Sequence, residues 1–418
     1  MHESNRYKTR PLYATKGVKR KRFGEFLFLA MQEIGKLVPD RMAKLFRKCC
    51  RLMCDERVFV VDQHPIEGMM VESVEVVPEN EQNIVSRLTD SFRKAKSAQS
   101  EVAPPYQPGA GWKNLLEDEW RKYLKAIDQN DIGIVSNFLR SFFRNEGLSG
   151  FWGGKQMFES FASADNVSSI RRAFIMRKQF EAWRTALPDA PVKELESPLI
   201  GNPWGYIVEG TLVVEPVPEY HYQAEYFAKL LSTVHNPVIL EIGGGYGGLA
   251  YQIMKKIPEA TYIGFDLPEN IFIQSYYLTC AFPDLKILTF GENQNNLTRS
   301  TIKEYDIILM PNFLIPRTED AVADLIINVR SLSEMPYETI EEYIKQIDRT
   351  SRLFFFHENI FKERRDELHG IPSPKFPQLN NHLLLSESES RWPRYQRDSV
   401  YPCHEYLYLH KDALKRSS

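Results

Sequence analysis

The sequence predicts an α/β fold: a Rossmann-like, mostly parallel sheet with a terminal antiparallel hairpin, preceded by a mainly helical N-terminal region. From about residue 197, short β-rich apolar runs alternate with helical stretches, as in a parallel sheet covered on both faces. The run "VILEIGGGYGG" at 238–248 joins a buried strand to a glycine-rich turn. Between residues 112 and 186, apolar residues recur every three or four positions, which indicates helices.

Composition excludes several classes of protein. The 418 residues are 43% hydrophobic and 12% aromatic, so we expect well-filled cores in more than one domain. With 53 Lys and Arg against 55 Asp and Glu, no overall field would gather nucleic acid, and we expect no such partner. The five cysteines lack metal-ligand spacing, which favours a reducing, cytoplasmic setting. We find neither a signal peptide nor an apolar run long enough to span a membrane.

The N-terminus is locally basic. Residues 1–51 contain 14 Lys or Arg and 4 Asp or Glu, and two stretches have the spacing of amphipathic helices. Their apolar faces are expected to pack on the next domain, although peripheral contact with an anionic membrane surface is an alternative. The predicted regions are a basic helical part (1–95), a Pro- and Gly-rich linker (96–111), a helical lid or acceptor-binding part (112–196) and a catalytic domain (197–418).

The elements of the last region follow in order. Strand 238–242 leads through the glycines into a helix whose Leu249, Ile253, Met254 and Ile257 face the sheet. A second strand, "TYIGF", ends in Asp266. Either 285–290 or 305–313 is strand three, and we favour the latter because it ends beside Asn312. The remaining expected elements are strands 323–335 and 351–360, the helix 336–349 between them, and a hairpin of 382–385 and 406–410.

The glycine turn predicts a ligand. It lies at the carboxyl edge of the first strand, where open α/β sheets bind ligands, and glycine lets ligand atoms approach the main chain. Asp266 stands 18 residues after Gly248, where its carboxylate can accept both hydroxyls of a ribose. The spacing therefore indicates a cofactor of the adenosine type.

Glu241 distinguishes between two such cofactors. Gly243, Gly245 and Gly248 also satisfy the dinucleotide pattern GxGxxG, but an anion just before the turn would repel a pyrophosphate. S-adenosylmethionine carries a sulfonium and an ammonium, so a carboxylate there is favourable. The alternative for Glu241 is a purely structural role, in which it caps the turn by accepting a main-chain N–H.

Five blocks of the sequence carry a family resemblance. "LEIGGGYGGLA", "FDLPE", "LMPNF", "IINVRSLSEM" and "FFFHEN", in this order, resemble the sugar O-methyltransferases, a class I S-adenosylmethionine-dependent group. The likeness covers about residues 197–410 and implies a sugar or glycoconjugate acceptor. The resemblance implies that Glu241, Gly243, Gly245 and Asp266 hold the donor. It implies that the donor pocket is lined by Gly244, Tyr246, Leu267, Asn312 and Asn328.

Methyl transfer to a hydroxyl benefits from a positioned base. His357 is our first candidate, with Glu358 beside it and Glu334 just past strand four; all three are expected at the carboxyl edge of the sheet. Before strand one, His221 and Tyr222 are candidates for a lid over the acceptor. The carboxylates and histidine show no dedicated ligand spacing, so we expect no metal.

Three other functions stay open at this point. The acceptor could be a secondary-metabolite or lipid-linked hydroxyl rather than a sugar. The GxGxxG match could instead belong to an NAD-dependent oxidoreductase. A non-catalytic scaffold is disfavoured, because it would have no use for an acid beside the glycines. The sequence also leaves open whether the protein forms a homo-oligomer.

Overall fold

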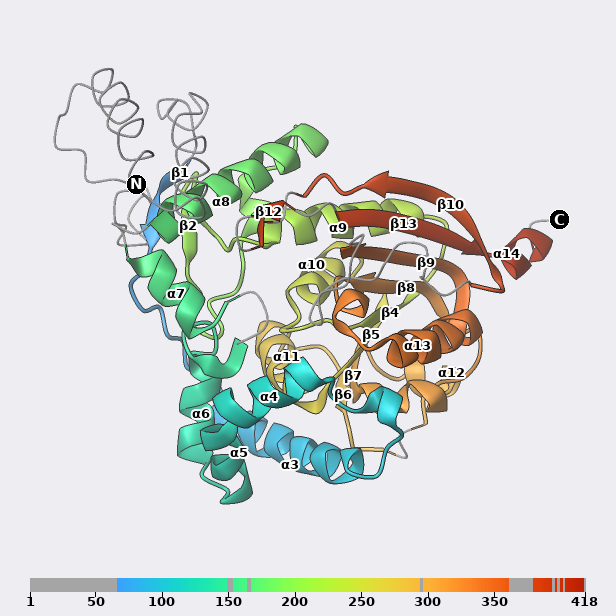
Figure 1. Ribbon diagram of the computed structural model, residues 1–418, viewed down its shortest axis with the longest axis horizontal. Coiled ribbons are helices and arrows are strands. Elements are labelled where there is room, and N and C mark those ends of the chain that lie inside the picture. The colour runs from blue at the N-terminus through green and yellow to red at the C-terminus, as the bar shows by residue number, and fades with distance from the viewer. Residues whose placement is uncertain are drawn as a thin grey trace, which may run out of the picture.

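The computed structural model describes residues 66–148, 153–163, 167–293, 296–360, 379–392, 395–396, 399–400 and 403–416. The basic segment 1–51, and with it the expected membrane contact, lies outside these residues. Figure 1 shows a central twisted sheet with helices on both faces and the N-terminal helices along one side. In the described part of the chain, no helix combines the length and the apolar character needed to cross a membrane.

The centre of the molecule is an eight-stranded sheet in the order β10-β13-β9-β8-β4-β5-β7-β6. Neighbours from β9 to β6 pair in parallel, whereas β13 is antiparallel to both β9 and β10. The Rossmann-like class with its terminal antiparallel hairpin is thus confirmed. The strands are β4 (Val238–Ile242), β5 (Thr261–Asp266), β6 (Ile287–Thr289), β7 (Ile307–Pro311), β8 (Ala323–Val329), β9 (Ser351–Ile360), β10 (His382–Glu389) and β13 (Cys403–His410).

The structure answers which run lies beside the second strand. β7 pairs with β5, and Asp266 is opposite Pro311, so Asn312 follows directly at the same edge of the sheet. β6, from the competing run, pairs only with the far side of β7 and forms the outer edge. Our preference for 305–313 as the strand beside β5 is confirmed.

One predicted strand is too long. We expected 323–335 to be extended, but β8 ends at Val329 and a 3-10 turn, η7 (Leu332–Glu334), follows. Arg330, between them, has a positive φ of 64°, a conformation that breaks the extended path and is uncommon for a residue with a Cβ. The turn directs residues 330–334 back over the end of the sheet.

The two faces of the sheet are covered by different helices, as expected from the alternation of side chains along a strand. In β4, Leu240 and Ile242 pack with Ile340 and Ile344 of α13, whereas Ile239 packs on the opposite face with helices α9 and α10. All four predicted sheet-facing residues of α10 are buried. The helices of this part are α9 (Val217–Leu230), α10 (Gly248–Lys256), α11 (Pro268–Ala281), α12 (Arg299–Ile302), α13 (Tyr337–Thr350) and α14 (Lys411–Arg416).

The N-terminal part is mainly helical, as predicted. Its helices are α3 (Glu81–Gln99), α4 (Ala110–Glu119), α5 (Arg121–Asp128), α6 (Ile132–Arg140), α7 (Lys155–Ala162) and α8 (Val167–Ala186). A small antiparallel sheet joins β1 (Ile66–Met70) to β2 (Gly205–Val208) and β3 (Thr211–Val213). The short elements are η3 (Pro104–Tyr106), η4 (Glu146–Leu148), η5 (Val192–Leu195), η6 (Asn312–Arg317), β11 (Tyr395–Gln396) and β12 (Ser399–Val400).

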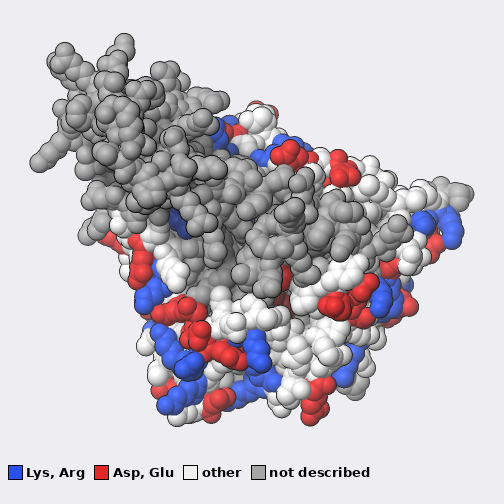
Figure 2. All heavy atoms as spheres, in the orientation of Figure 1, with Lys and Arg blue, Asp and Glu red and all other residues white. Residues whose placement is uncertain are grey.

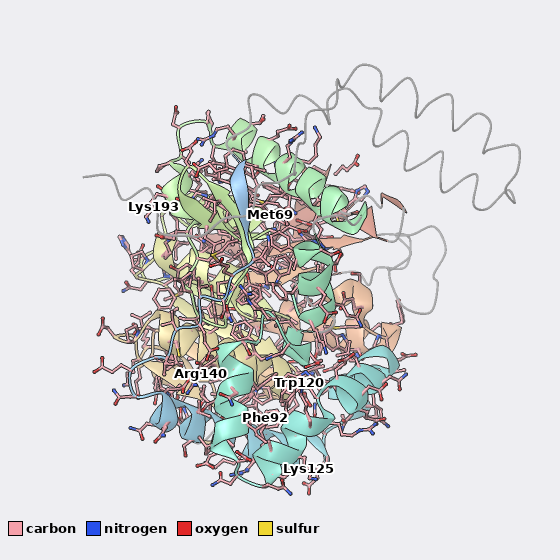
Figure 3. The ribbon with its side chains drawn as sticks, turned by 90° about the vertical axis from the view of Figure 1, so that its left-hand side faces the viewer. Met69, Phe92, Trp120, Lys125, Arg140 and Lys193 are labelled. Carbon is pink, nitrogen blue, oxygen red and sulfur yellow. The ribbon has the colours of Figure 1, made fainter. Side chains whose placement is uncertain are left out.

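Helix α3 attaches the N-terminal part to the central sheet. The ring of Phe92 lies 6.4 Å from that of Trp120 (Figure 3) and 5.1 Å from that of Phe272 in α11. Arg87 binds Glu292 through two hydrogen bonds of 2.6 and 2.9 Å. Phe92 and Leu116, on either side of the predicted linker, belong to the same hydrophobic core. On the outside, basic and acidic side chains lie next to one another in the view of Figure 2.

Candidate functional site

The glycine turn after β4 is built from backbone conformations that favour glycine. Gly243, Gly245 and Gly247 have φ values of +80°, +58° and +94°, in the left-handed region that costs other residues free energy. A Cβ on Gly243 would overlap the Ser331 side chain, and a Cβ on Gly244 would lie 2.6 Å from Gln274 Nε2. The main chain at 243–245 remains partly exposed, so a ligand can reach it.

Glu241 lies beneath this turn. Its carboxylate is 2% exposed and accepts a hydrogen bond from the hydroxyl of Tyr262 on β5. Burial raises the pKa of Glu241 to about 7; the Tyr262 bond opposes the rise and the charge of Asp266 adds to it. A Cβ on Gly244 would lie 3.1 Å from Glu241 Oε2. Only the backbone of the turn therefore separates the carboxylate from a ligand bound on the other side, and its charge can attract a cationic group there.

Asp266 caps the turn, the role that we had considered for Glu241. Its Oδ2 accepts the main-chain N–H of Gly245 at 3.0 Å, and its Oδ1 accepts from Leu267 N and Asn270 Nδ2, both at 2.7 Å. Burial raises the pKa of Asp266 to about 6 against these hydrogen bonds. Asp266 and Leu267 both keep some exposed surface, so the Asp266 carboxylate faces the same space as the glycine turn.

Glu334 completes the group of acids. Its side chain is exposed, yet desolvation raises its pKa to about 7, with the charge of Asp266 adding to the rise and a hydrogen bond from Trp112 opposing it. We call this site the acidic recess; it is formed by Gly243–Gly245, Asp266, Leu267 and Glu334, with Glu241 below. In the described part of the chain, no lysine or arginine forms an ion pair with its three carboxylates.

The amide of Asn312 lies next to the recess, because Asn312 follows the residue opposite Asp266. Its Nδ2 donates to the Tyr106 carbonyl at 3.1 Å and to the Tyr343 hydroxyl at 2.8 Å. Its buried Oδ1 has no hydrogen-bond partner among the described residues. That oxygen can accept a hydrogen bond from a ligand.

Asn328 has a supporting position beneath the edge of the sheet. It is fully buried, and its Nδ2 donates to the Ile242 carbonyl at 2.9 Å and to the Ser331 hydroxyl. Its Oδ1 accepts from Leu332 N at 3.2 Å and Asn359 Nδ2 at 3.1 Å. Asn328 therefore fixes the ends of β4, β8 and β9 relative to one another, rather than offering a group to the recess.

The other predicted pocket and lid residues lie on the helical side. The Tyr246 ring is buried among aromatic rings, with Phe143 5.0 Å and Tyr277 5.3 Å away. The Tyr222 ring packs on Trp392 at 5.5 Å and on the guanidinium of Arg391 at 4.6 Å. Tyr246 thus joins the turn to the N-terminal helices, and Tyr222 contacts the segment after β10.

His221 belongs to the cluster among the described residues that has metal-like spacing, with Glu194 and Glu225. Trp183 Nε1, which can only donate, lies 3.1 Å from His221 Nδ1. The neutral imidazole therefore carries its proton on Nε2, which donates to Glu194 Oε2 at 2.7 Å. Lys256 already pairs with Glu225. Both ring nitrogens of His221 are hydrogen-bonded, and Lys256 already supplies a positive charge next to Glu225. The cluster therefore does not fit a metal ion.

The strand-five candidates are more buried than we expected. His357 is 0% exposed; its ring stacks on Tyr406 at 4.8 Å, and burial lowers its pKa to about 3. Glu358, also 0% exposed, accepts from Arg330 Nε at 2.9 Å and from Gln223 Nε2 at 3.2 Å. The structure therefore brings Glu334 together with Glu241 and Asp266, and places His357 and Glu358 inside the sheet layers.

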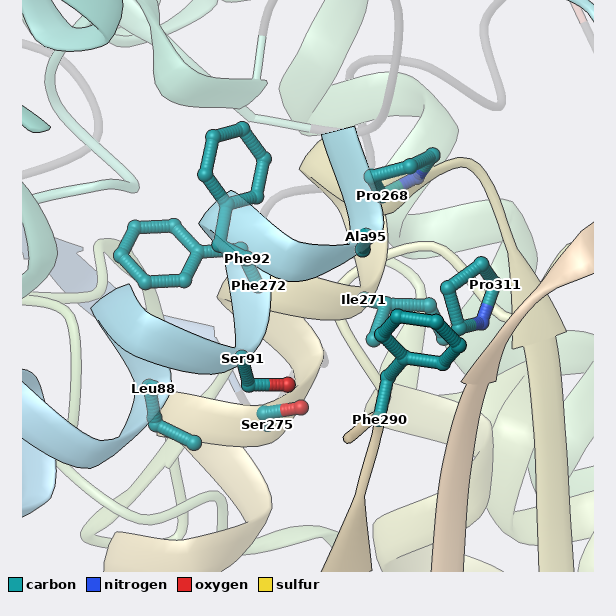
Figure 4. Close-up of a pocket in the computed structure, with 10 residues that line it drawn as sticks. All are labelled: Leu88, Ser91, Phe92, Ala95, Pro268, Ile271, Phe272, Ser275, Phe290 and Pro311. Atoms are coloured by element: carbon teal, nitrogen blue, oxygen red, sulfur yellow. The ribbon is translucent and has the colours of Figure 1, made fainter. Parts of the chain in front are cut away.

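A narrow cavity lies between α3 and α11, lined by Phe92, Ile271, Phe290 and Pro311 and by the hydroxyls of Ser91 and Ser275 (Figure 4). Its volume of about 10 Å³ is near the lower limit for one water molecule. It is too small for a nucleoside and is therefore not a candidate for the cofactor site.

Sequence reasoning missed three residues that contact the site: Tyr262 at Glu241, Trp112 at Glu334 and Tyr106 at Asn312. Tyr262 shares a strand face with buried apolar residues, and a tyrosine in such a place usually needs a hydrogen-bond partner; that signal was available. Tyr106 comes from the predicted linker and Trp112 from the start of the predicted helical region; each lies more than 200 residues away in sequence from its partner, Asn312 or Glu334. No pattern within a few residues of Trp112 or Tyr106 predicts contacts with residues so distant in the chain.

Comparisons with known proteins give fold neighbours only. No protein family and no curated protein matches the sequence, so the sugar O-methyltransferase resemblance remains a prediction. Among solved structures, magnesium protoporphyrin IX methyltransferase from Synechocystis PCC 6803 with bound SAM has 10% identity and a TM-score of 0.32, covering 58% of this chain and 96% of its own. A SAM-dependent methyltransferase from Aquifex aeolicus has 12% identity and a TM-score of 0.29, with coverages of 45% and 89%.

A third neighbour is geranyl diphosphate methyltransferase in complex with GPP and sinefungin, at 10% identity and a TM-score of 0.33, covering 47% of this chain and 80% of its own. The acceptors named for these proteins, a porphyrin and a terpene diphosphate, are not sugars. The sugar acceptor therefore gains no support from them.

Proposed function

We propose that this protein is an S-adenosylmethionine-dependent O-methyltransferase whose donor binds in the acidic recess. One observation carries the proposal: Glu241, Asp266 and Glu334 lie near a glycine turn, burial raises the pKa of each, and the charge of Asp266 adds to the rise for Glu241 and Glu334. Such a site is short of positive charge. A ligand that brings a sulfonium and an ammonium relieves the repulsion, whereas a pyrophosphate would increase it.

The residues around the recess fit the adenosine part as well. Asp266 is partly exposed at the end of the second strand, where a carboxylate can accept the ribose hydroxyls. The unsatisfied Oδ1 of Asn312 can accept from an exocyclic amino group. The positive φ of Gly243 and Gly245 keeps side chains off the turn, and this leaves main-chain groups within reach of the ligand.

When bound, S-adenosylmethionine supplies a methyl group that is already activated by its sulfonium. The protein must then align an acceptor oxygen and receive its proton. Among the three predicted bases, Glu334 fits this role best, because it is accessible and its pKa of about 7 lies near the working pH. His357 is a weak base in its buried site, and the Glu358 carboxylate is occupied by Arg330.

The acceptor is proposed as a hydroxyl, and its sugar nature rests on the sequence resemblance. A secondary-metabolite or lipid-linked hydroxyl is the second candidate. Mass spectrometry of glycans from cells lacking the protein tests the first: the loss of a methyl group from one glycan supports a sugar, and an unchanged glycan profile with a changed lipid or metabolite supports the second.

Calorimetric titration tests the donor. We expect S-adenosylmethionine to bind wild-type protein and NAD to show no binding. Asp266→Asn should lower the affinity for S-adenosylmethionine at least about tenfold, because a charge-assisted hydrogen bond is lost. Glu259→Gln, which removes one charge from an exposed position, is the matched control and should bind normally. NAD binding without S-adenosylmethionine binding would overturn the proposal in favour of an oxidoreductase.

A further inference from the structure

The predicted linker lies over the carboxyl edge of the sheet. The Tyr106 carbonyl accepts from Asn312 Nδ2 at 3.1 Å, and its hydroxyl donates to Glu342 Oε1 of α13 at 3.1 Å. The rings of Tyr106 and Tyr343 lie 5.7 Å apart. Three residues further along, the backbone of Gly109 lies against Pro336, since a Cβ there would be 3.4 Å from Pro336 Cδ. The segment 104–112 is therefore held against the edge of the sheet at two points, Tyr106 and Gly109.

Trp112, in the first turn of α4, reaches the recess itself. Its side chain forms a hydrogen bond with the Glu334 carboxylate. The indole N–H can only donate, so Glu334 is the acceptor and its charged form is favoured. The charged group that faces Glu334 from β5 is Asp266, which acts in the opposite direction. Arg330, four residues before Glu334, is paired with Glu219 and Glu358 and supplies no compensating charge.

Trp112 is the hydrogen-bond partner that the described part of the chain provides for the Glu334 carboxylate. Glu334 is the last residue of the 3-10 turn η7 and its side chain is exposed. A carboxylate in such a position samples several rotamers unless a partner fixes one. The indole is a rigid partner whose own position is set by α4 and by the contact of Gly109 with Pro336.

We propose that Trp112 is a positioning residue, which orients the Glu334 carboxylate in the acidic recess for donor binding and proton acceptance. This inference rests on the proposed function. It gives the segment 104–112 a role in the chemistry of the site, as the part of the helical region that reaches Glu334.

The test is the pH dependence of S-adenosylmethionine affinity, measured by calorimetry on the full chain between pH 5.5 and about 9. Trp112→Phe keeps an aromatic ring and removes the N–H. Because the lost bond favours the carboxylate, Glu334 should protonate more readily, and the midpoint of the affinity profile should rise by about half a pH unit or more. Affinity at high pH should stay within about twofold of the wild type.

Two further variants make the result decisive. Glu334→Gln removes the titrating group, so adding Trp112→Phe to it should change nothing; a double-mutant cycle measures this coupling. Trp120→Phe, a tryptophan change in the core of the helical region, controls for packing and should leave the midpoint unchanged. If Trp112→Phe does not fold, as judged by circular dichroism, Trp112→Leu, whose side chain also lacks a donor, replaces it.

The outcomes separate the two ideas. An unchanged midpoint in Trp112→Phe, or equal effects of that change with and without Glu334, would overturn the role of Trp112 while leaving donor binding intact. Failure of the wild-type protein to bind S-adenosylmethionine at any pH would instead remove the proposed function.

Discussion

Two groups of three buried or recessed carboxylates lie at the same edge of the sheet, and they are neutralised differently. In the acidic recess, Glu241, Asp266 and Glu334 have hydrogen-bond donors around them. In the second group, which we call the arginine cluster, Arg330 pairs with Glu219 and, at 2.9 Å, with Glu358, and Glu405 lies opposite Glu358. The arginine cluster therefore contains its own cation, whereas among the described residues no lysine or arginine forms an ion pair with the carboxylates of the recess.

The carboxylates of the arginine cluster are nevertheless only partly neutralised. One guanidinium serves two buried carboxylates, and the pKa of Glu358 is raised to about 8 by burial. Glu405, opposite Glu358 in the β9–β13 register, has its pKa raised to about 7 by burial and by the charge of Glu358. Arg330 also adopts a left-handed backbone conformation, which persists only where the surroundings enforce it. The raised pKa values show that the carboxylates are incompletely neutralised, and the backbone conformation of Arg330 shows that the surrounding structure holds it in place.

The largest expected effect is the loss of that cation. Arg330→Met should lower the free energy of unfolding by about 3–5 kcal/mol, because it leaves Glu219 and Glu358 buried without a counter-ion. Urea unfolding measures it. Arg299→Met, which breaks an exposed pair with Glu319, is the control and should cost less than about 1 kcal/mol. Equal costs for the two variants would contradict the distinction between the two groups.

The matching change in the recess should affect binding rather than stability. Glu241→Gln removes a carboxylate that is already costly to ionise, so the free energy of unfolding should stay the same or rise. Affinity for S-adenosylmethionine should fall about tenfold, measured by calorimetry. The fall should be smaller for S-adenosylhomocysteine, which lacks the sulfonium. A variant that loses stability and keeps affinity would place Glu241 with the structural acids.

The pH dependence should show the same contrast at a smaller scale. Cation binding favours the ionised acids, so affinity for S-adenosylmethionine should rise about fivefold between pH 6 and pH 8, as Glu241, Asp266 and Glu334 lose their protons. Without ligand, the folded state holds these protons more tightly than the unfolded chain. The three acids should therefore reduce stability as pH rises from about 4 to about 7, and this decline should be shallower in Glu241→Gln. A pH-independent affinity would argue against a cationic ligand.

The smallest expected effect belongs to our first candidate base. His357→Asn should change turnover by no more than a few-fold, because the ring is fully buried and its pKa is lowered to about 3. Glu334→Gln should lower turnover by about 10² or more. Methyl transfer to the identified acceptor, measured for both variants side by side, checks the order. A larger loss in His357→Asn would restore His357 as the base.

Particular residues show how far sequence reasoning reached. The strand 238–242, the glycine turn, Asp266 at the end of the second strand and the terminal hairpin were all predictable, since each depends on a repeat or spacing within a few residues. The end of β8 was not, because nothing in "IINVRSLSEM" signals that Arg330 takes a positive φ. The complete burial of His357 could not be predicted either, because its position near the end of a strand does not show which aromatic rings of β13 will cover its side chain.

By itself, the sequence determined the sheet and the place where its first crossover presents main-chain groups to a ligand, because side-chain alternation and glycine conformations are local properties. Only the tertiary structure decided which charges are paired. Trp112 meets Glu334, and Arg330 joins α9 to β9, through helix packing across distances of up to 222 residues in the chain. Those contacts determine how far each carboxylate is removed from water and whether a basic side chain pairs with it. A carboxylate paired with Arg330 stabilises the fold, whereas the carboxylates of the recess are proposed to bind a cationic ligand.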